Sequence, residues 1–444
     1  MVKLSTDGHT QNDIQPALRR WPSKLFVETT TRCNLSCRMC VKQASGSNIM
    51  EGDMQASTFA SLRPAFRRLE ALILNGIGEP LAHPRLDDFV REARQHMPPA
   101  AWIGFQTNGL LLNYNRACSL LNAGLNKICI SIDTSDPAKL RKIREGAELS
   151  AIDKALTTLA RAKAATVTTD FHIGIEFVLM RSNMADLPDL LTWAAQRNVS
   201  FVIVTHILPY RRDDEQEAVY TTCSDEAIAL FRQWSARARA GGVELERYPT
   251  IRWNYHKSAA DQMIVQFIER MKTEAESRGI FLDLKKLFQL DPVWIDQVSA
   301  LYHRAEEIAQ QHQLDLKLPA QILKEQRRCE FVEDGSLFVS WVGDVHPCYF
   351  LWHTYRCHAS GWEQQVHAKT FGNVKDTDIL QLWNSSRFAD FRHNVISYDY
   401  PFCSSCGLAP CDYVQTNQFE QDCHIHEEPC GSCLWCMGLF QCLR

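Results

Sequence analysis

Three closely spaced cysteines are the first residues whose type and spacing indicate chemistry. Cys33, Cys37 and Cys40 stand in the stretch CNLSCRMC, with three residues in the first gap and two in the second. Thiolates at this spacing can bind a metal ion or an iron–sulfur cluster, although a structural zinc site needs four protein ligands. No cysteine or histidine follows within the next forty residues, so the nearby sequence offers no obvious fourth ligand.

A second concentration of cysteines lies near the end of the chain. Of the 17 cysteines, 11 fall within the last 116 residues, between Cys329 and Cys442. Such clustering indicates disulfides in a secreted protein and metal or iron–sulfur sites in a cytosolic one. The N-terminal stretch MVKLSTDGHTQNDIQPALRRWPS is polar and contains no apolar signal-peptide segment. We therefore expect a cytoplasmic protein whose cysteines bind metal.

Alternating strands and helices must position the first cysteine group. Strands rich in Ile and Val that are separated by amphipathic helices predict βα units around a parallel sheet. Such a sheet suits a partial or full βα barrel, whose chemistry lies at the C-terminal ends of the strands. CNLSCRMC directly follows the first strand. The six expected strands lie at residues 25–30, 71–76, 101–109, 126–133, 171–180 and 200–208, and GGVELE (241–246) is a further candidate.

The remaining segments differ in character. Within residues 250–325, apolar residues such as Ile264, Ile268 and Met271 recur at helical spacing and predict a helical connector. The last part combines short strands, turns and cysteines, so its thin core would need bound clusters to fold. The expected organisation is an N-terminal tail (1–22), a core barrel (23–250), a helical connector (251–325) and a cysteine-rich domain (326–444).

Composition limits the classes of partner. Hydrophobic residues make up 45% of the chain and charged residues 23%, with a formal net charge of −4 and both signs interspersed. There is no basic stripe of the kind that binds nucleic acid. No apolar segment is long enough to span a bilayer. We expect neither nucleic acid nor a membrane as a partner.

The stretch CNLSCRMC resembles the cluster loop of radical S-adenosylmethionine (SAM) enzymes. The resemblance implies that Cys33, Cys37 and Cys40 bind a 4Fe–4S cluster and form the catalytic centre. The amine and carboxylate of SAM would chelate the open iron, so the fourth ligand would be the cofactor itself. Reduction would then cleave SAM to a 5′-deoxyadenosyl radical that removes a hydrogen atom from a substrate.

Further positions resemble the family in the expected order along the barrel. The family contacts the SAM ammonium group at a GEP motif, the ribose at the end of the fourth strand, the carboxylate through an arginine and the adenine through an apolar residue. A turn is the alternative for the GEP motif here, and a solvated helix charge is the alternative for the arginine. The contacts implied are Met39, Gly78, Glu79, Pro80, Ser131, Asp133 and Arg144, with Val178 and Leu208 as weaker adenine candidates.

The cysteine-rich end resembles a SPASM domain, which holds one or two auxiliary 4Fe–4S clusters. Cys329, Gly343 and Cys348 match the opening of that domain in spacing, and FGNVKDTDILQLWNSSRFADFR resembles its connecting helix. The match weakens after Cys411. The implied ligands are Cys329, Cys348, Cys403, Cys406 and Cys411, with the remainder drawn from Cys423, Cys430, Cys433, Cys436 and Cys442. Their partition stays open, as does the role of Cys357.

Among SPASM proteins, the stretches DVHPCYFLWH and PCGSCLWCMGLFQC look most like metalloenzyme maturases. This resemblance implies a peptide, protein or metallocofactor precursor as substrate, and a reducing partner such as flavodoxin or ferredoxin. Two alternatives remain. A zinc-stapled binding protein or an iron–sulfur electron carrier would explain the C-terminal cysteines, but neither explains CNLSCRMC and the ordered SAM motifs on one barrel.

Overall fold

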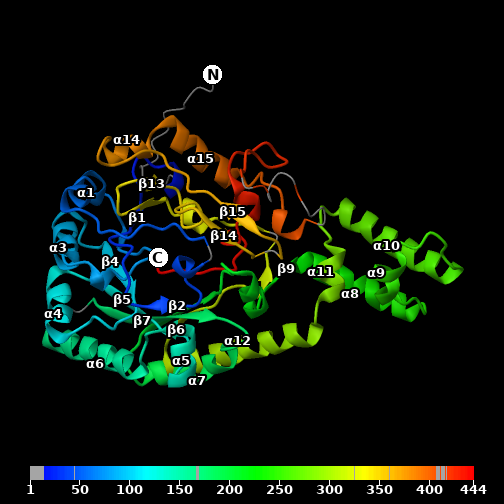
Figure 1. The fold of residues 1–444 in the computed structure, drawn as a ribbon, viewed down its shortest axis with the longest axis horizontal. Coiled ribbons are helices and arrows are strands. Elements are labelled where there is room, and N and C mark those ends of the chain that lie inside the picture. Colours follow the sequence, from blue (N-terminus) through cyan, green and yellow to red (C-terminus); the bar gives the residue numbers. More distant parts are fainter. Residues whose placement is uncertain are drawn as a thin grey trace.

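Six parallel strands form the centre of the computed structural model, which describes residues 15–44, 46–166, 170–324, 326–359, 361–406, 411, 416 and 418–444. Each strand pairs in parallel with the next, and the sheet curves around a common centre with helices outside (Figure 1). The six predicted strands and the α/β class are confirmed. The strands are β1 (Lys24–Val27), β3 (Ala71–Ile73), β4 (Trp102–Thr107), β5 (Lys127–Ser131), β7 (His172–Leu179) and β8 (Phe201–His206).

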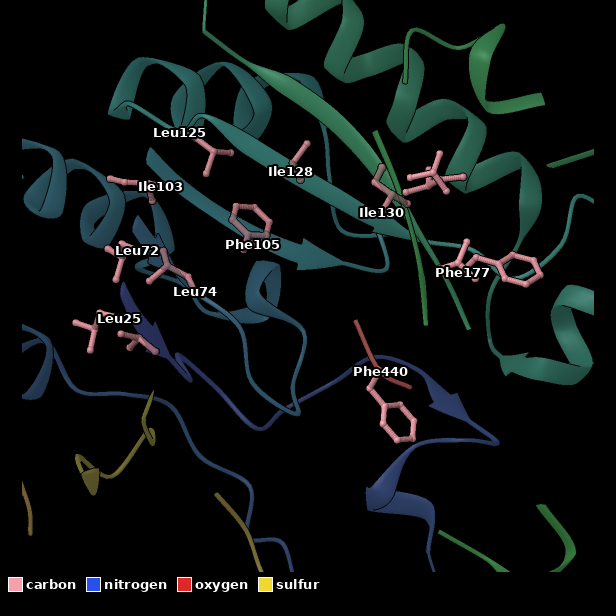
Figure 2. Packing of buried hydrophobic residues seen from close by; sticks show 14 of the residues in the cluster. Leu25, Leu72, Leu74, Ile103, Phe105, Leu125, Ile128, Ile130, Phe177 and Phe440 are labelled. Atoms are coloured by element: carbon pink, nitrogen blue, oxygen red, sulfur yellow. The ribbon is translucent and has the colours of Figure 1, made fainter. Parts of the chain in front are cut away.

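Helices between these strands cover the outer face of the sheet. They form because apolar residues recur on one side of each helix, as Leu86, Phe89 and Val90 do in α3. Beneath them, alternate strand residues such as Phe105 and Ile128 pack into the outer core (Figure 2). The helices of the barrel are α1 (Ala56–Ala60), α2 (Arg63–Phe66), α3 (Leu86–His96), α4 (Tyr114–Ala123), α5 (Pro137–Ile143), α6 (Leu149–Ala165) and α7 (Leu187–Ala195).

Strands from the second half of the chain extend the barrel sheet at both edges. β12 (Ser336–Val339) pairs in parallel with β1, from Lys24 opposite Ser336 to Val27 opposite Val339, and β13 (Val345–His346) follows antiparallel. At the other edge, β10 (Asp315–Lys317) pairs in parallel with β8. Because an exposed edge leaves backbone groups unpaired, these strands complete the barrel and join the C-terminal domain to it.

The interior of the barrel has two layers. Side chains alternate between the faces of a strand, so every second residue points inward. An apolar layer contains Phe26, Ile73, Cys129, Ile203 and Phe338, all buried. Further along the strands, toward their C-terminal ends, the inward residues become polar and line a cavity. They are Asn75, Gln106, Ser131, Glu176 and Thr205.

A helical subdomain projects to one side of the barrel (Figure 1). Its helices are α8 (Asp225–Ala240), α9 (Tyr248–Ile251), α10 (Ala259–Ser277) and α11 (Leu284–Gln289), and they share a core of their own. The predicted strand in GGVELE is wrong, because residues 241–246 form a turn and the start of a short 3-10 helix. The connector expected from residue 251 therefore shares its core with α8, which lies within the range expected for the barrel.

After this subdomain the chain returns to the barrel through α12 (Pro292–His312), which packs on α7. No helix of the described ranges is long and apolar enough to cross a membrane. The remaining elements are β2 (Ser36–Cys37), β6 (Arg144–Glu145), β9 (Thr221–Ser224), β11 (Ile322–Leu323), α13 (Glu330–Glu333), β14 (Tyr355–Cys357), β15 (Gln364–Val366), α14 (Ile379–Trp383) and α15 (Ser386–Ser397).

Trp383 links the C-terminal domain to the segment that precedes β1. Its ring is fully buried, its indole N–H donates to the Arg19 carbonyl at 2.9 Å, and the Arg392 guanidinium lies 3.7 Å from the ring centroid. We predict that Trp383→Ala lowers the free energy of unfolding by roughly 3–5 kcal/mol, because it leaves a large cavity. Chemical denaturation measures the loss. Trp253→Ala is the control, since Trp253 is 79% exposed, and an equal loss there would contradict the prediction.

Candidate functional site

The loop of Cys33, Cys37 and Cys40 is held at the C-terminal end of the barrel. It leaves β1, and its short strand β2 pairs antiparallel with β6, which sets Cys37 opposite Arg144. The Arg38 N–H donates to the Ile143 carbonyl at 3.0 Å, and a turn closes from the Cys40 N–H to the Cys37 carbonyl at 3.0 Å. The cysteine loop and the arginine segment, about a hundred residues apart, therefore form one unit.

Burial dominates the acidity of these three thiols. It raises the pKa of Cys33 and Cys37, and it raises the pKa of Cys40 to about 11. The negative charges of neighbouring cysteines add to this effect for Cys33 and Cys40, which places the thiols close together. Bound iron would replace the protons, since metal ligands must be deprotonated. Three thiols that face one cavity fit a cluster with three protein ligands.

A cavity of about 360 Å³ opens above the polar layer, at the C-terminal ends of the strands. The three cysteines line it together with most of the residues expected to contact SAM. Pro80 and Asp133 are not among the lining residues, so a direct cofactor contact from either does not follow from the geometry. The expected residues that line the cavity are Cys33, Cys37, Met39, Cys40, Gly78, Glu79, Ser131, Arg144, Val178 and Leu208.

Glu79 lines the cavity and also accepts hydrogen bonds from neighbouring residues of the protein. Its carboxylate accepts hydrogen bonds from the Leu81 N–H at 3.0 Å, the Asn108 N–H at 2.7 Å and the Thr107 hydroxyl. Burial raises the pKa of this carboxyl, and the three donors oppose the rise. Gly78 beside it is sterically required, because a Cβ there would lie 2.3 Å from the Thr30 carbonyl oxygen. Glu79 thereby joins the ends of β3 and β4.

Asp133 holds Arg144 from behind the cavity. The guanidinium donates to the carboxylate through Nε at 2.6 Å and Nη2 at 3.2 Å, and the Val178 N–H donates to the same group at 2.9 Å. Asp133 is fully buried, whereas Arg144 reaches the cavity. Asp133 is therefore a positioning residue, which aims a cation at the space beside Cys37 instead of touching a ligand itself.

Apolar residues form one wall of the cavity. Met39 and Val178 pack against the buried side chains of Ile143, Met180 and Ile207. This wall is formed by the cysteine loop, β7 and the residues that directly follow β7 and β8. An apolar wall is the kind of surface on which a heteroaromatic ring packs. Met39 and Val178 thus share one apolar wall, and their contact with adenine stays a prediction.

Sequence reasoning missed a buried carboxylate that connects the site to the C-terminal domain. Glu28, just after β1, accepts a hydrogen bond from the Ile77 N–H at 3.1 Å, and His353 Nε2 lies 3.1 Å from the same oxygen. Gly76 is required beside it, because a Cβ there would lie 2.3 Å from the Glu28 side chain. The glutamate that directly follows the apolar residues LFV within LFVETT was the signal that could have found it.

Glu176 and His206 are two further cavity residues without a sequence motif. Burial raises the pKa of Glu176 to about 7, and the nearby Arg144 guanidinium opposes that rise. His206 is 2% exposed and its Nε2 lies 2.9 Å from the Ala320 carbonyl oxygen. Because a carbonyl only accepts, Nε2 carries the proton and Nδ1 is an acceptor. Nδ1 has no hydrogen-bond partner among the residues that the structure describes.

The C-terminal cysteines separate into two groups, which their electrostatic effects on one another identify. Burial raises the thiol pKa of Cys329, Cys348, Cys430, Cys403 and Cys423, and the charges of neighbouring cysteines add to it, whereas a hydrogen bond with Cys436 lowers the pKa of Cys433. Group I contains Cys329, Cys348, Cys430 and Cys433. Group II contains Cys403, Cys406, Cys411 and Cys423. Within the described parts of the chain, no three His, Cys, Asp or Glu side chains converge on a single-ion site.

Arg327 lies between the two cysteine groups. Burial lowers the pKa of its guanidinium, while Cys436, Cys403 of group II, and Cys433 and Cys430 of group I act to raise it. Its N–H groups donate to the carbonyls of Tyr400 and Pro401 at 2.7 and 2.6 Å. A fixed buried cation between two sets of thiols favours their thiolate forms and therefore fits two anionic cluster sites.

Comparisons with known proteins agree with this arrangement. The model of the radical SAM superfamily matches residues 27–194, and the SPASM iron–sulfur cluster-binding domain matches residues 329–407. The chain belongs to the radical SAM superfamily and carries a SPASM domain. It is a radical SAM enzyme, and its cofactors are SAM and 4Fe–4S clusters, with auxiliary iron–sulfur binding in the SPASM domain. These findings confirm the recognition, the enzyme class and the cofactors expected from sequence.

Individual relatives extend the comparison over most of the chain. A tungsten-containing aldehyde ferredoxin oxidoreductase cofactor-modifying protein of Pyrococcus furiosus is 28% identical and covers 94% of this chain and 96% of its own length. A GTP 3′,8-cyclase of Bradyrhizobium diazoefficiens is 30% identical over 41% of this chain and 52% of its own. SAM-bound Streptococcus suis SuiB has the same fold, with a TM-score of 0.50, 11% identity and coverage of 85% and 69%.

The Asp133–Arg144 pair allows a direct test of positioning. We predict that Asp133→Ala lowers the free energy of unfolding of the apoprotein by roughly 3–5 kcal/mol, because the Arg144 guanidinium stays buried without its partner. Chemical denaturation measures the loss, and calorimetry should find weaker SAM binding.

Glu148→Ala is the matched control for this prediction. Arg141 donates two hydrogen bonds to Glu148 at 2.8 and 2.9 Å, but both side chains are more than half exposed. Water replaces such a pair, so the unfolding midpoint should not change. Equal midpoint shifts in the two variants would contradict a special role for the buried pair.

The buried imidazole of His206 makes the free energy of unfolding depend on pH. Burial lowers the pKa of its imidazole to about 4, so the native state stays neutral while the unfolded chain takes up a proton near pH 6.5. The stabilisation is present above pH 6.5 and is lost as pH falls toward 4, by about 3 kcal/mol over that window. We predict that His206→Gln, which cannot titrate, loses less stability than wild type between pH 7 and 4. His303→Gln, at an exposed site, should follow the wild-type curve.

Proposed function

We propose that the cavity at the C-terminal end of the barrel binds a 4Fe–4S cluster through Cys33, Cys37 and Cys40, with SAM beside it. The supporting observation is that these thiols and Gly78, Glu79, Ser131 and Arg144 line one cavity although they come from four separate segments. When bound, the cluster and SAM supply a primary carbon radical that removes a hydrogen atom from the substrate.

The residues of the chain bind and orient these groups. Arg144, held rigid by Asp133, offers a guanidinium to the carboxylate of SAM at the side of Cys37. The backbone at Gly78 allows close approach to the ammonium group, and Glu79 adds negative charge there while it orders the loop. Ser131 is placed for the ribose, and the wall of Met39 and Val178 for the adenine.

Two auxiliary clusters are proposed for the C-terminal domain, one at each cysteine group. Group I (Cys329, Cys348, Cys430, Cys433) and group II (Cys403, Cys406, Cys411, Cys423) each contain the four thiols that a cuboidal cluster requires. Cys436 and Cys442, which sequence analysis counted among the ligands, fall outside this set. Cys436 lies beside group I, because the charges of Cys433 and Cys329 affect its thiol. That thiol donates to the Cys433 carbonyl at 3.0 Å, so we assign it a supporting role without iron.

The proposed substrate is a peptide, a protein or a metallocofactor precursor carried by one. The full-length similarity to a protein that modifies the cofactor of a tungsten enzyme supports this class. A second cleft, of about 1250 Å³, lies between the helical subdomain and the C-terminal domain and would admit an extended chain. Its lining mixes cations such as Arg252 and Lys272 with aromatic residues such as Phe281 and Trp362, and includes Cys406 of group II.

A one-electron donor such as flavodoxin or ferredoxin is the proposed reducing partner, and the cytoplasm the proposed location. None of the 17 cysteines, all of which the structure describes, forms a disulfide. Free thiols in this number suit a reducing compartment, where iron–sulfur clusters also persist.

Anaerobic reconstitution tests the function. We predict three clusters, about twelve iron atoms per chain, and formation of 5′-deoxyadenosine when SAM and a low-potential reductant are added. The triple variant Cys33→Ala, Cys37→Ala, Cys40→Ala should keep the auxiliary clusters, about eight iron atoms, and lose all SAM cleavage. Iron and sulfide analysis, electron paramagnetic resonance and chromatography measure these quantities.

A variant of an unrelated thiol serves as the control. Cys118→Ala changes a half-buried cysteine of α4 outside all three sites, and it should retain both iron and SAM cleavage. Zinc in place of iron would overturn the proposal in favour of a zinc-stapled protein. SAM cleavage that survives in the triple variant would overturn the assignment of the first three cysteines.

A further inference from the structure

The last residues of the chain enter the interior of the barrel. The C-terminus lies at the centre of the ring of strands in Figure 1, and Leu443 is 2% exposed within the apolar layer beside Phe26, Ile203 and Phe338. The Gln441 N–H donates to the Thr205 hydroxyl of β8 at 3.1 Å, and Arg444 pairs with Glu330. The tail is therefore anchored on both sides of the residue between them, Cys442.

This anchoring places the Cys442 thiol at the junction of the two interior layers. Leu443 belongs to the apolar layer, and Cys442 lines the cavity together with Glu176, Tyr349 and Phe440. The cavity is the one that contains the three N-terminal cysteines. Cys442 thus faces the reaction space although it lies four hundred residues from CNLSCRMC in sequence.

Cys442 also borders a smaller pocket that Cys329, Cys348 and Cys433 line, but its electrostatic surroundings differ from theirs. The charged groups that affect its thiol are Arg444, Glu176, Lys24 and Glu330, with no cysteine among them. By contrast, Cys329 and Cys430 each experience at least two other cysteines. Burial raises the pKa of Cys442 to about 11, so the sulfur keeps its hydrogen at neutral pH.

Two polar groups beside the thiol have no role in the proposed SAM site. The carboxyl of Glu176 lines the same cavity and has a pKa raised by burial to about 7, so it can exchange a proton near neutrality. The buried imidazole of His206 lines the cavity as well, with Nδ1 unpartnered among the described residues. An unpartnered buried acceptor is costly, which indicates that a ligand with a hydrogen-bond donor occupies this part of the cavity.

We propose that Cys442 is a substrate-facing catalytic thiol that donates its hydrogen atom to a carbon radical on the bound substrate. The inference rests on the proposed function, because it needs radical chemistry in this cavity. The substrate class is a molecule that carries a hydrogen-bond donor for His206 and whose radical is quenched in place. Cys442 is then a catalytic residue and no cluster ligand.

Hydrogen-atom donation by Cys442 and recovery of its thiol conserve atoms and electrons. The S–H bond of Cys442 breaks and a C–H bond forms on the substrate, which leaves a thiyl radical at the sulfur. The thiyl takes one electron from the same class of one-electron donor that radical SAM chemistry requires, and one proton through Glu176 from water. The thiol is thereby restored, the substrate radical is reduced by one hydrogen atom, and the donor is oxidised by one electron.

Iron content distinguishes a cysteine that binds a cluster from a catalytic cysteine that does not. Cys442→Ala and Cys442→Ser, reconstituted anaerobically as the full chain, should hold as much iron and sulfide as wild type. Cys433→Ser, a change within group I, should lose about four iron atoms. Loss of iron from the Cys442 variants equal to that from Cys433→Ser would overturn the proposal.

Deuterium transfer tests the hydrogen donation itself. Thiol hydrogens exchange with D₂O, whereas carbon-bound hydrogens do not. With SAM, dithionite and no added substrate, the 5′-deoxyadenosyl radical serves as the probe, and mass spectrometry should find one deuterium in the wild-type 5′-deoxyadenosine. Both Cys442 variants should lose this label, because alanine has no exchangeable hydrogen and the serine O–H bond is too strong to donate. Cys129→Ala, which removes a buried thiol of the apolar layer, should retain it.

The outcomes distinguish this inference from the proposed function. Wild-type protein that forms no 5′-deoxyadenosine would overturn both. Wild-type protein that forms unlabelled 5′-deoxyadenosine, or label that persists in Cys442→Ala, would overturn the role of Cys442 and leave the proposed function standing.

Discussion

The pairing of β1 with β12 is the constraint on which the rest of the molecule depends. Four residues of each strand align in parallel, so the C-terminal domain is part of the barrel sheet instead of a separate body. Glu28 reinforces the join, because one buried carboxylate contacts both the loop before Gly78 and His353 of the C-terminal domain. Since β1 leads into the cysteine loop and β12 leads toward Cys348, the pairing sets the relative positions of the first cysteine group and group I.

Buried charge in the cavity is compensated in nearly every case by a specific partner. Asp133 neutralises Arg144, three donors serve Glu79, and the Ile77 N–H and His353 serve Glu28. Such groups contribute little net stability, because desolvation offsets their attraction, but they hold side chains in one orientation. One exception among the described residues that line the cavity is the Nδ1 of His206, which has no hydrogen-bond partner. Groups that a folded protein leaves unsatisfied are those that a ligand completes.

The two interior layers explain how one barrel combines stability with reactivity. Phe26, Ile73, Ile203 and Phe338 fill the lower interior, and the buried Leu443 from the tail packs among them. Polar residues begin toward the C-terminal ends of the strands, where the cavity opens. The change from apolar to polar follows from strand geometry, since inward positions recur every second residue. The reactive groups therefore lie at the C-terminal ends of the strands, where the loops begin.

Local patterns in the sequence were sufficient to predict the strands of the barrel, the cysteine loop and the existence of a set of auxiliary cysteines. Alternating Ile- and Val-rich strands and amphipathic helices are short-range signals, and CNLSCRMC is contiguous, so Cys33, Cys37 and Cys40 needed no fold to be recognised. Glu28, Glu176 and His206 gave no comparable signal, because each stands in or directly after a strand and belongs to no contiguous motif. The division of the tail cysteines, and the return of Cys442 to the barrel, depend on long-range pairing of β12 and on the anchoring of Leu443 and Arg444. Contacts of that kind arise from packing between distant segments, which only the folded chain specifies.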